Sequence, residues 1–357
     1  MARLESFSPD WISPPGNTIV NILRDQGMST RQFADEIGQN LDDVEALLEG
    51  RTPISISTAR QLSRVLGASV EFWMTRDCKY RDNVARLTST HKDWLSELPV
   101  RDMVEFKWMK PAVDSSMAIA ACLRYFDVPS VSVWQQTYGK LPAHYAFRLS
   151  DASECRTAAV AAWLRQGEIE AEKIPCRAWD KKLLDATIPK LKTLTKIKDP
   201  AQFIPKLQIL CAECGVAVVV VRAPAGCPAS GATRFLPEGK ALLQLSFRHL
   251  SDDQFWFSLF HELGHLLLHG KMGFFIEDGK SLSSPEEQEA NDFAADLLVP
   301  LEYKSELKKL IADSKAVIRF AVSVGVSPGI IVGQLQHLKI IGHDRLNGLK
   351  RRYEWVK

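Results

Sequence analysis

The amino-acid sequence predicts a multi-domain, mainly α-helical protein with one α+β region, in which a buried helix packs against a small mixed sheet. Three observations predict this architecture. The 357 residues are enough for two or three domains. Most of the chain has the apolar spacing of amphipathic helices, and only residues 215–221, 231–236 and 241–247 have strand patterns. The apolar segment at 252–269, which follows these strands, has the spacing of a long helix.

The N-terminal region is predicted to form five short helices, at residues 17–26, 30–37, 41–48, 58–66 and 71–76. Ser29 is placed to cap the second helix and Gly38 to end it. The third helix occupies the place of the recognition helix in a helix-turn-helix. With residues 14–16 before it and 66–73 at its end, this region resembles the HigA-like branch of Cro/C1-type domains. That resemblance implies an all-α antitoxin or autorepressor domain.

The charge of this helical region disfavours strong DNA binding. Between residues 17 and 75, five arginines stand against eight acidic residues, a net charge of −3. Four of the acids lie on the predicted recognition helix: Asp42, Asp43, Glu45 and Glu49. Because neutralising phosphates supplies most non-specific affinity, we expect this helix to bind DNA weakly. Two interpretations stay open, a DNA reader and a bundle used for partner recognition or for forming a homodimer.

Basic residues gather in two other places. Six lysines at 181–198 are typical of a solvated helix face and also of a stripe that faces nucleic acid. Residues 301–357 contain eleven Lys and Arg residues against five acids, and 326–338 has a second helix-turn-helix-like pattern. A solvated basic tail is one interpretation of this end. The other is contact with single- or double-stranded DNA, for which the candidate residues are Lys350, Arg351 and Arg352.

The long apolar helix carries the motif HExxH from His261 to His265. Histidines four residues apart lie on one helix face, so both imidazoles can reach one Zn²⁺. Glu262, beside the first histidine, is placed to take a proton from a water molecule at the metal. The pattern therefore predicts a metallopeptidase centre with Glu262 as its catalytic base. Ser251 with Gln254 predicts a capping box at the start of the helix, and Gly270 its end.

A zinc centre of this kind needs a third protein ligand, which a second helix at 285–298 can supply. Glu287 shares a face with Ala290 and Ala294, whose small side chains allow close approach to the HExxH helix. Glu287 is therefore the predicted ligand, and a capping-box glutamate is its alternative role. Asn291, on the same face, is expected to orient a zinc histidine or to be a packed polar residue.

His269 is excluded from the same ion by geometry. It lies eight residues after His261, roughly 12 Å farther along a straight helix. A structural role or a contact with substrate is expected for it. The residue that stabilises the oxyanion is not evident, and His269 and Tyr303 are its candidates.

The HExxH motif, followed by Glu287, Ala290, Asn291, Phe293, Ala294, Leu297, Leu298 and Pro300, resembles the ImmA/IrrE family of metallopeptidases. The resemblance implies a zincin-like fold with a gluzincin-type zinc site, and cleavage of a repressor protein in circuits of mobile elements or stress responses. In some members activity is linked to DNA. The resemblance also suggests that strand 241–247 forms the sheet edge beside the zinc helix. A peptide substrate would then contact Leu243, Gln244 and Leu245 by strand addition.

These observations predict a zinc-dependent endopeptidase that cleaves a repressor or a toxin-like partner in a stress, toxin–antitoxin or phage-related circuit. The alternative is a HigA-like DNA-binding regulator whose zinc site is structural or sensory. No long apolar span or signal-peptide pattern is evident, so a cytoplasmic location without membrane contact is expected. The predicted segments are a tail at 1–13, a helix-turn-helix domain at 14–78, a helical linker domain at 79–200, a metallopeptidase domain at 201–300 and a basic helical segment at 301–357.

Overall fold

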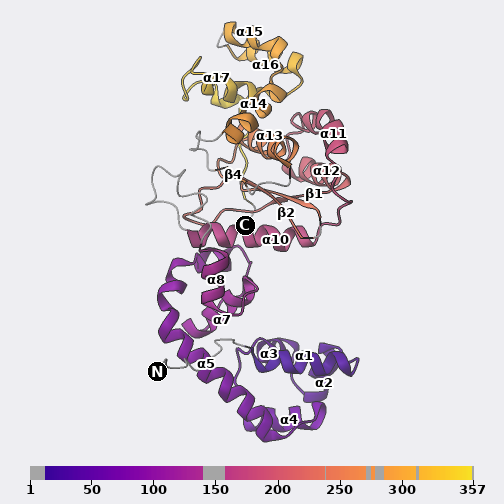
Figure 1. Cartoon of the computed structure of the whole chain (residues 1–357), viewed down its shortest axis with the longest axis vertical. Coiled ribbons are helices and arrows are strands. Elements are labelled where there is room, and N and C mark those ends of the chain that lie inside the picture. Colours follow the sequence, from indigo (N-terminus) through magenta and orange to yellow (C-terminus); the bar gives the residue numbers. More distant parts are fainter. Residues whose placement is uncertain are drawn as a thin grey trace, which may run out of the picture. The chain divides into compact units, whose positions relative to one another are not determined.

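The computed structural model describes residues 13–139, 157–237, 239–270, 275–277, 285–310 and 313–355, without the side chains of 85–90 and 275–277. The chain separates into two compact units, Met1–Lys140 and Leu141–Lys357, here called the N-terminal unit and the C-terminal unit (Figure 1). Each is described by itself. The division into the five predicted segments stays a prediction.

The N-terminal unit consists of helices, which are α1 (Pro15–Asp25), α2 (Thr30–Ile37), α3 (Leu41–Leu48), α4 (Ile56–Leu66), α5 (Val70–Glu97), α6 (Val100–Glu105), α7 (Ser115–Tyr125) and α8 (Val131–Thr137). The helix starts follow from local chemistry, because Ser29 accepts a hydrogen bond from the backbone N–H of Gln32 and forms a capping box with it. Gly38 ends α2 in the left-handed conformation, as predicted. The helix predicted at 71–76 is longer than expected, because neither glycine nor proline interrupts the residues that follow it, and α5 is kinked at His91, where the backbone leaves the helical conformation.

The first helices of this unit share a core that includes Ile19, Phe33, Leu62 and Trp73, all fully buried. Helices α1 and α3 approach closely at Gly16. A Cβ atom at this position would lie 1.8 Å from the carbonyl oxygen of Leu48, so no larger residue fits without displacing a helix.

The C-terminal unit is built on a four-stranded mixed sheet. Its helices are α10 (Thr157–Glu172), α11 (Lys181–Leu194), α12 (Pro200–Glu213), α13 (Asp252–Leu268), α14 (Pro285–Leu298), α15 (Leu301–Lys309), α16 (Ser314–Val324) and α17 (Pro328–His337), with a 3₁₀ turn η2 (Asn347–Leu349). The strands are β1 (Val216–Val220), β2 (Gly231–Phe235), β3 (Ala241–Leu245) and β4 (Phe275–Glu277), in the order β1-β3-β2-β4. Strand β1 is parallel to β3, whereas β2 is antiparallel to β3 and β4.

This strand order contradicts the expectation that 241–247 forms the sheet edge. Strand β3 lies inside the sheet because β1 pairs with its outer side. Leu243, Gln244 and Leu245 are at most 1% exposed, so a peptide cannot add to this strand. Among the described strands, β1 and β4 are the outer ones.

Helices α10 and α13 lie on opposite sides of the sheet (Figure 1). Successive residues of a strand point to opposite faces, so their side chains face α10 and α13 in turn. Toward α10, Gln244 donates a hydrogen bond to the carbonyl oxygen of Trp163 (2.7 Å), and Arg234 pairs with Glu168. The alternate positions of β2, Gly231 and Thr233, face α13.

The chain after η2 pairs with the loop that enters α13. The backbone N–H of Asp252 donates to the carbonyl oxygen of Arg351, which ties this segment to the start of the helix. The Lys350 ammonium lies 2.6 Å from the carboxylate of Asp253, and these side chains are 9% and 3% exposed. The Arg351 guanidinium donates to three carbonyl groups that follow α11.

These contacts count against the expected role of Lys350 and Arg351 in nucleic-acid binding, because both cations already bind groups of the protein. Arg352 is exposed, and its guanidinium donates to the carbonyl oxygen of His249.

Among the described helices, no single one is long and apolar enough to cross a membrane, although the bent pair α16 and α17 passes the same test by length and composition.

Candidate metal centre

The HExxH motif lies in the C-terminal half of α13, whose helical conformation and end near Gly270 agree with the prediction. The predicted capping box is wrong. Ser251 stands at the N-cap, but its side chain accepts no hydrogen bond from the helix. Its backbone forms a β-bridge with Arg352 instead, and Gln254 is exposed.

Three predicted ligands converge between α13 and α14. The Nε2 atoms of His261 and His265 lie 3.0 Å apart, and the Glu287 carboxylate lies 3.2 Å from the first and 3.5 Å from the second. One ligand atom from each residue falls within 4.8 Å of the others. All three side chains are almost fully buried. Two imidazole nitrogens and one carboxylate oxygen are the donor set that Zn²⁺ prefers, so these residues fit such an ion.

The outer nitrogens of the two imidazoles contact further side chains. His261 Nδ1 lies 3.0 Å from Asn291 Oδ1. His265 Nδ1 lies 3.2 Å from Nδ1 of His269, whose Nε2 is 3.0 Å from the Glu289 carboxylate. These contacts orient each ring so that Nε2 points into the cluster. His269 thus lies beside the cluster and outside it, in a supporting position.

Glu287 reaches the cluster because α13 and α14 pack closely. At Gly264 an added Cβ would lie 3.0 Å from the ring of Phe293 and 3.3 Å from Cα of Ala290. Small residues at this crossing let the two backbones approach closely, as predicted from the small side chains that share a face with Glu287.

The electrostatics of the cluster suit a cation. Burial alone would raise the pKa of Glu287, but hydrogen bonds from His261 and His265 outweigh it and lower the pKa to about 2. Burial lowers the pKa of His265, which favours the neutral imidazole that binds a metal. The centre therefore presents an ionised carboxylate beside a neutral ring at neutral pH.

Glu262 is held on the sheet side of α13. Its carboxylate is fully buried, and the Thr233 hydroxyl donates a 2.5 Å hydrogen bond to Oε2. A Cβ at Gly231 would lie 2.4 Å from Oε1, so only glycine leaves room for this carboxylate. Thr233 and Gly231 were not among the predicted site residues. Their alternation along β2 was visible in the sequence, but not that this strand faces the motif.

The remaining predicted contacts lie elsewhere. The Tyr303 ring packs against Phe320 of α16, and the structure does not bring it into the histidine cluster. Leu243, Gln244 and Leu245 are enclosed in the interior of the sheet.

The fold and the site together define a metallopeptidase-like region, with a HExxH helix against a mixed sheet and a glutamate from the next helix. Residues 216–335, from β1 into α17, match the family model of the IrrE N-terminal-like domain, peptidase family M78. This family implies a metallopeptidase, and the match supports the resemblance to ImmA/IrrE proteins. A comparison with curated proteins found no match.

Proposed function

We propose that this protein is a zinc-dependent endopeptidase of the gluzincin type that acts as a regulator by cleaving a repressor or another partner protein. The observation that carries the proposal is the convergence of His261, His265 and Glu287, with Glu262 buried on the same helix. A purely structural zinc site has no need of a glutamate that is not a ligand. Asn291 and His269 orient the ligand rings.

The chain's own residues supply the proton transfers. Bound at this centre, Zn²⁺ would polarise the scissile carbonyl and make a water molecule more acidic. The Glu262 carboxylate takes the proton from the attacking water and delivers it to the leaving amine. Thr233 fixes the direction of this carboxylate through Oε2, and Gly231 leaves the space in which Oε1 lies.

Thr233 gives the first test of this arrangement. Thr233→Val keeps the shape of the side chain but removes the donor to Glu262, so we expect kcat to fall about tenfold at unchanged zinc content. Thr233→Ser, which keeps the hydroxyl, is expected to retain most of the activity. Steady-state kinetics of the three proteins check this, and equal kcat for the valine variant and the wild type would contradict the role.

We place the substrate strand at β4. It is an outer strand of the sheet, pairs with β2, and contacts α13. An extended peptide that adds to this edge would run beside the metal centre. The earlier assignment to β3 is excluded by its interior position.

The regulatory role is a proposal that rests on the IrrE-like match and on the separate helical unit that precedes it. The circuit is of the stress, toxin–antitoxin or phage-related kind. The test uses the zinc-loaded full chain with proteins that co-purify with it, before and after nucleic acid is added. Mass spectrometry is expected to find new N-termini on a few proteins, and none in the presence of a chelator. A zinc-loaded protein that produces no new N-terminus in either condition overturns the proposal.

A second candidate function, a DNA-binding regulator with a sensory zinc site, attaches to the N-terminal unit. Helices α2 and α3 are separated by three residues, a spacing typical of a helix-turn-helix. Lys110 lies 2.9 Å from Glu45 and 3.0 Å from Glu49, so part of the acidic charge on α3 is neutralised. Asp42 and Asp43 stay exposed at the start of α3, where they would repel phosphate. In the same experiment, recovery of one DNA sequence without any cleaved protein would favour this candidate.

A further inference from the structure

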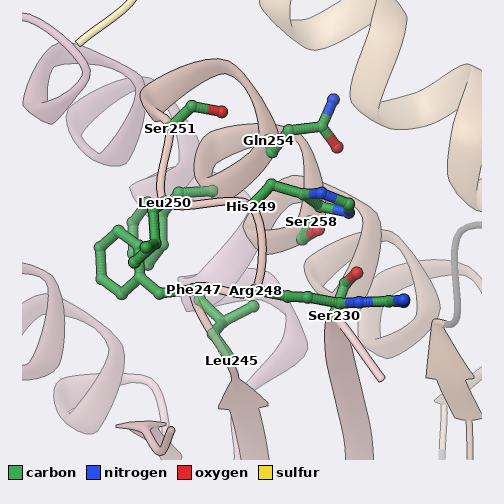
Figure 2. Close-up of a pocket in the computed structure, with 10 residues that line it drawn as sticks. Ser230, Leu245, Phe247, Arg248, His249, Leu250, Ser251, Gln254 and Ser258 are labelled. Carbon is green, nitrogen blue, oxygen red and sulfur yellow. The ribbon is translucent and has the colours of Figure 1, made fainter. Parts of the chain in front are cut away.

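The loop between β3 and α13 is strained. Phe247 and Leu250 both adopt the left-handed backbone conformation, with φ angles of 53° and 49°. Residues other than glycine avoid this conformation because Cβ comes too close to the following carbonyl oxygen, so it persists only where surrounding contacts enforce it. Figure 2 shows how this loop, which lines a small cavity, leads from β3 into α13, the helix that carries HExxH. Strain of this kind is concentrated at active sites and switch regions.

Residues 350–355, here called the clasp segment, contact the loop at both strained residues. The backbone N–H of Tyr353 donates a 2.9 Å hydrogen bond to the carbonyl oxygen of Leu250. The Phe247 ring lies edge-on to the rings of Tyr353 and Trp355, with centroids 5.2 and 6.1 Å apart. The strained loop is therefore held by a segment about one hundred positions away in the sequence.

The clasp segment also binds the two acidic residues that begin α13. The Asp253 side chain is 3% exposed, and the Lys350 ammonium lies 2.6 Å from its carboxylate. Asp252 is fully buried and accepts a 3.0 Å hydrogen bond from the backbone N–H of Arg351. A Cβ at Gly329 of α17 would lie 2.3 Å from an oxygen of Asp252, so α17 closes this side of the carboxylate.

Release of the clasp segment would change the start of α13. Without Lys350, the Asp253 carboxylate is an unpaired charge in the protein interior, which favours opening of the first turn of α13 to bring this group to water. The loop would at the same time relax from its left-handed conformation. Both changes move the start of the helix, so the clasped and released arrangements are two distinct states.

The position of α13 on the sheet determines whether Glu262 is aligned. Glu262 lies nine residues after Asp253, roughly 14 Å along the same helix. Its carboxylate lies between the Thr233 hydroxyl and Gly231, where a Cβ would be 2.4 Å from Oε1, so the space permits little movement. The candidate metal ligands are less sensitive to a shift, because α14 packs on α13 and carries Glu287 with it.

We propose that residues 350–355 are a conformational clasp, and that Lys350 and Tyr353 are positioning residues for Glu262. Release of the clasp lowers catalysis and leaves zinc bound. The inference rests on the proposed peptidase function and adds a form of regulation to the same site. A partner that binds the clasp segment in its released state turns the peptidase off.

Amide hydrogen exchange of the full chain tests the clasp without relying on catalysis. Lys350→Met keeps an unbranched apolar stem and removes the charge, so we expect exchange at the amides of Asp252 and Tyr353 to accelerate at least about tenfold. These two amides form hydrogen bonds between the loop and the clasp segment. The amide of Leu207, within α12, is expected to keep its wild-type rate. Equal acceleration at all three amides would report global unfolding and overturn the clasp.

A double variant separates a positioning role from a simple loss of stability. The unpaired Asp253 carboxylate drives release in Lys350→Met, so adding Asp253→Asn, which has the same shape without the charge, is expected to restore slow exchange. In peptide cleavage, kcat is expected to fall about tenfold in Lys350→Met at unchanged KM and zinc content, and to recover in the double variant. Lys315→Met, at an exposed position of α16, is the matched control and is expected to keep wild-type values.

The outcomes distinguish this inference from the proposed function. Faster local exchange that Asp253→Asn reverses supports the clasp even when no peptide is cleaved and the peptidase proposal fails. A wild-type kcat in Lys350→Met, together with faster local exchange, overturns the positioning role. Wild-type exchange in this variant overturns the clasp altogether and leaves the peptidase proposal standing.

Discussion

Replacing Glu262 with glutamine is expected to lower kcat for peptide-bond cleavage by at least about 10³-fold and to leave the zinc content unchanged. Glutamine has the volume of glutamate, so the fully buried site keeps its packing and can still accept the Thr233 hydrogen bond. What it loses is the ability to accept and return a proton. The candidate ligands His261, His265 and Glu287 are unchanged in this variant.

Two measurements on the same preparation check this result. Elemental analysis gives the zinc content, and the rate at which new N-termini form gives the activity. Glu213→Gln, at an exposed position of α12, is the matched control and is expected to cleave like the wild type. Full activity in Glu262→Gln would remove Glu262 from the mechanism and favour a sensory zinc site.

Replacing Glu287 with alanine is expected to weaken zinc binding more than about 100-fold. Removing a residue that only supports a metal ligand typically weakens metal binding by about 10- to 100-fold, so the loss of a ligand should exceed this range. The carboxylate contacts both Nε2 atoms and is buried with them, so its removal leaves two histidines and a cavity. Cleavage should fall in parallel, because an ion held by two ligands is easily lost. Competition with a chelator of known affinity measures the loss.

Glu289→Ala is the matched control, two residues away on the same helix. The Glu289 side chain is 63% exposed and, among the residues that the structure describes, contacts the far nitrogen of His269, one ring removed from the candidate ligand His265. We expect this variant to keep zinc at full stoichiometry. The reverse pattern, with zinc lost from Glu289→Ala and kept by Glu287→Ala, would move the third ligand to Glu289.

Much of the metal centre was predictable because it depends on local geometry. The spacing of His261 and His265 places them on one face wherever a helix forms, and the apolar pattern of 252–269 predicts that helix. The choice of Glu287 over Glu289 rested on a helical face with small residues, and this face packs against Gly264 in the structure.

Strand pairing was less predictable because it joins residues that are distant in sequence. The hairpin of β2 and β3 follows from a short turn, but a parallel partner can lie on either side of it. Strand β1 takes the outer side of β3, which encloses Gln244, and β4 pairs with β2 at the opposite edge. The packing of α13 on one face of the sheet brings Glu262 to Thr233.

The sequence by itself determined that most of the chain is helical, where the HExxH helix lies and which residue is the third ligand candidate, since each depends on periodicity within one segment. Only the tertiary structure decided which strand is exposed, which residues hold Glu262, and how the basic C-terminal residues act. From the sequence we expected Lys350 to be a surface charge. In the structure it is buried against Asp253, about one hundred positions earlier in the chain. Burial and pairing of this kind depend on long-range packing, which no local pattern encodes.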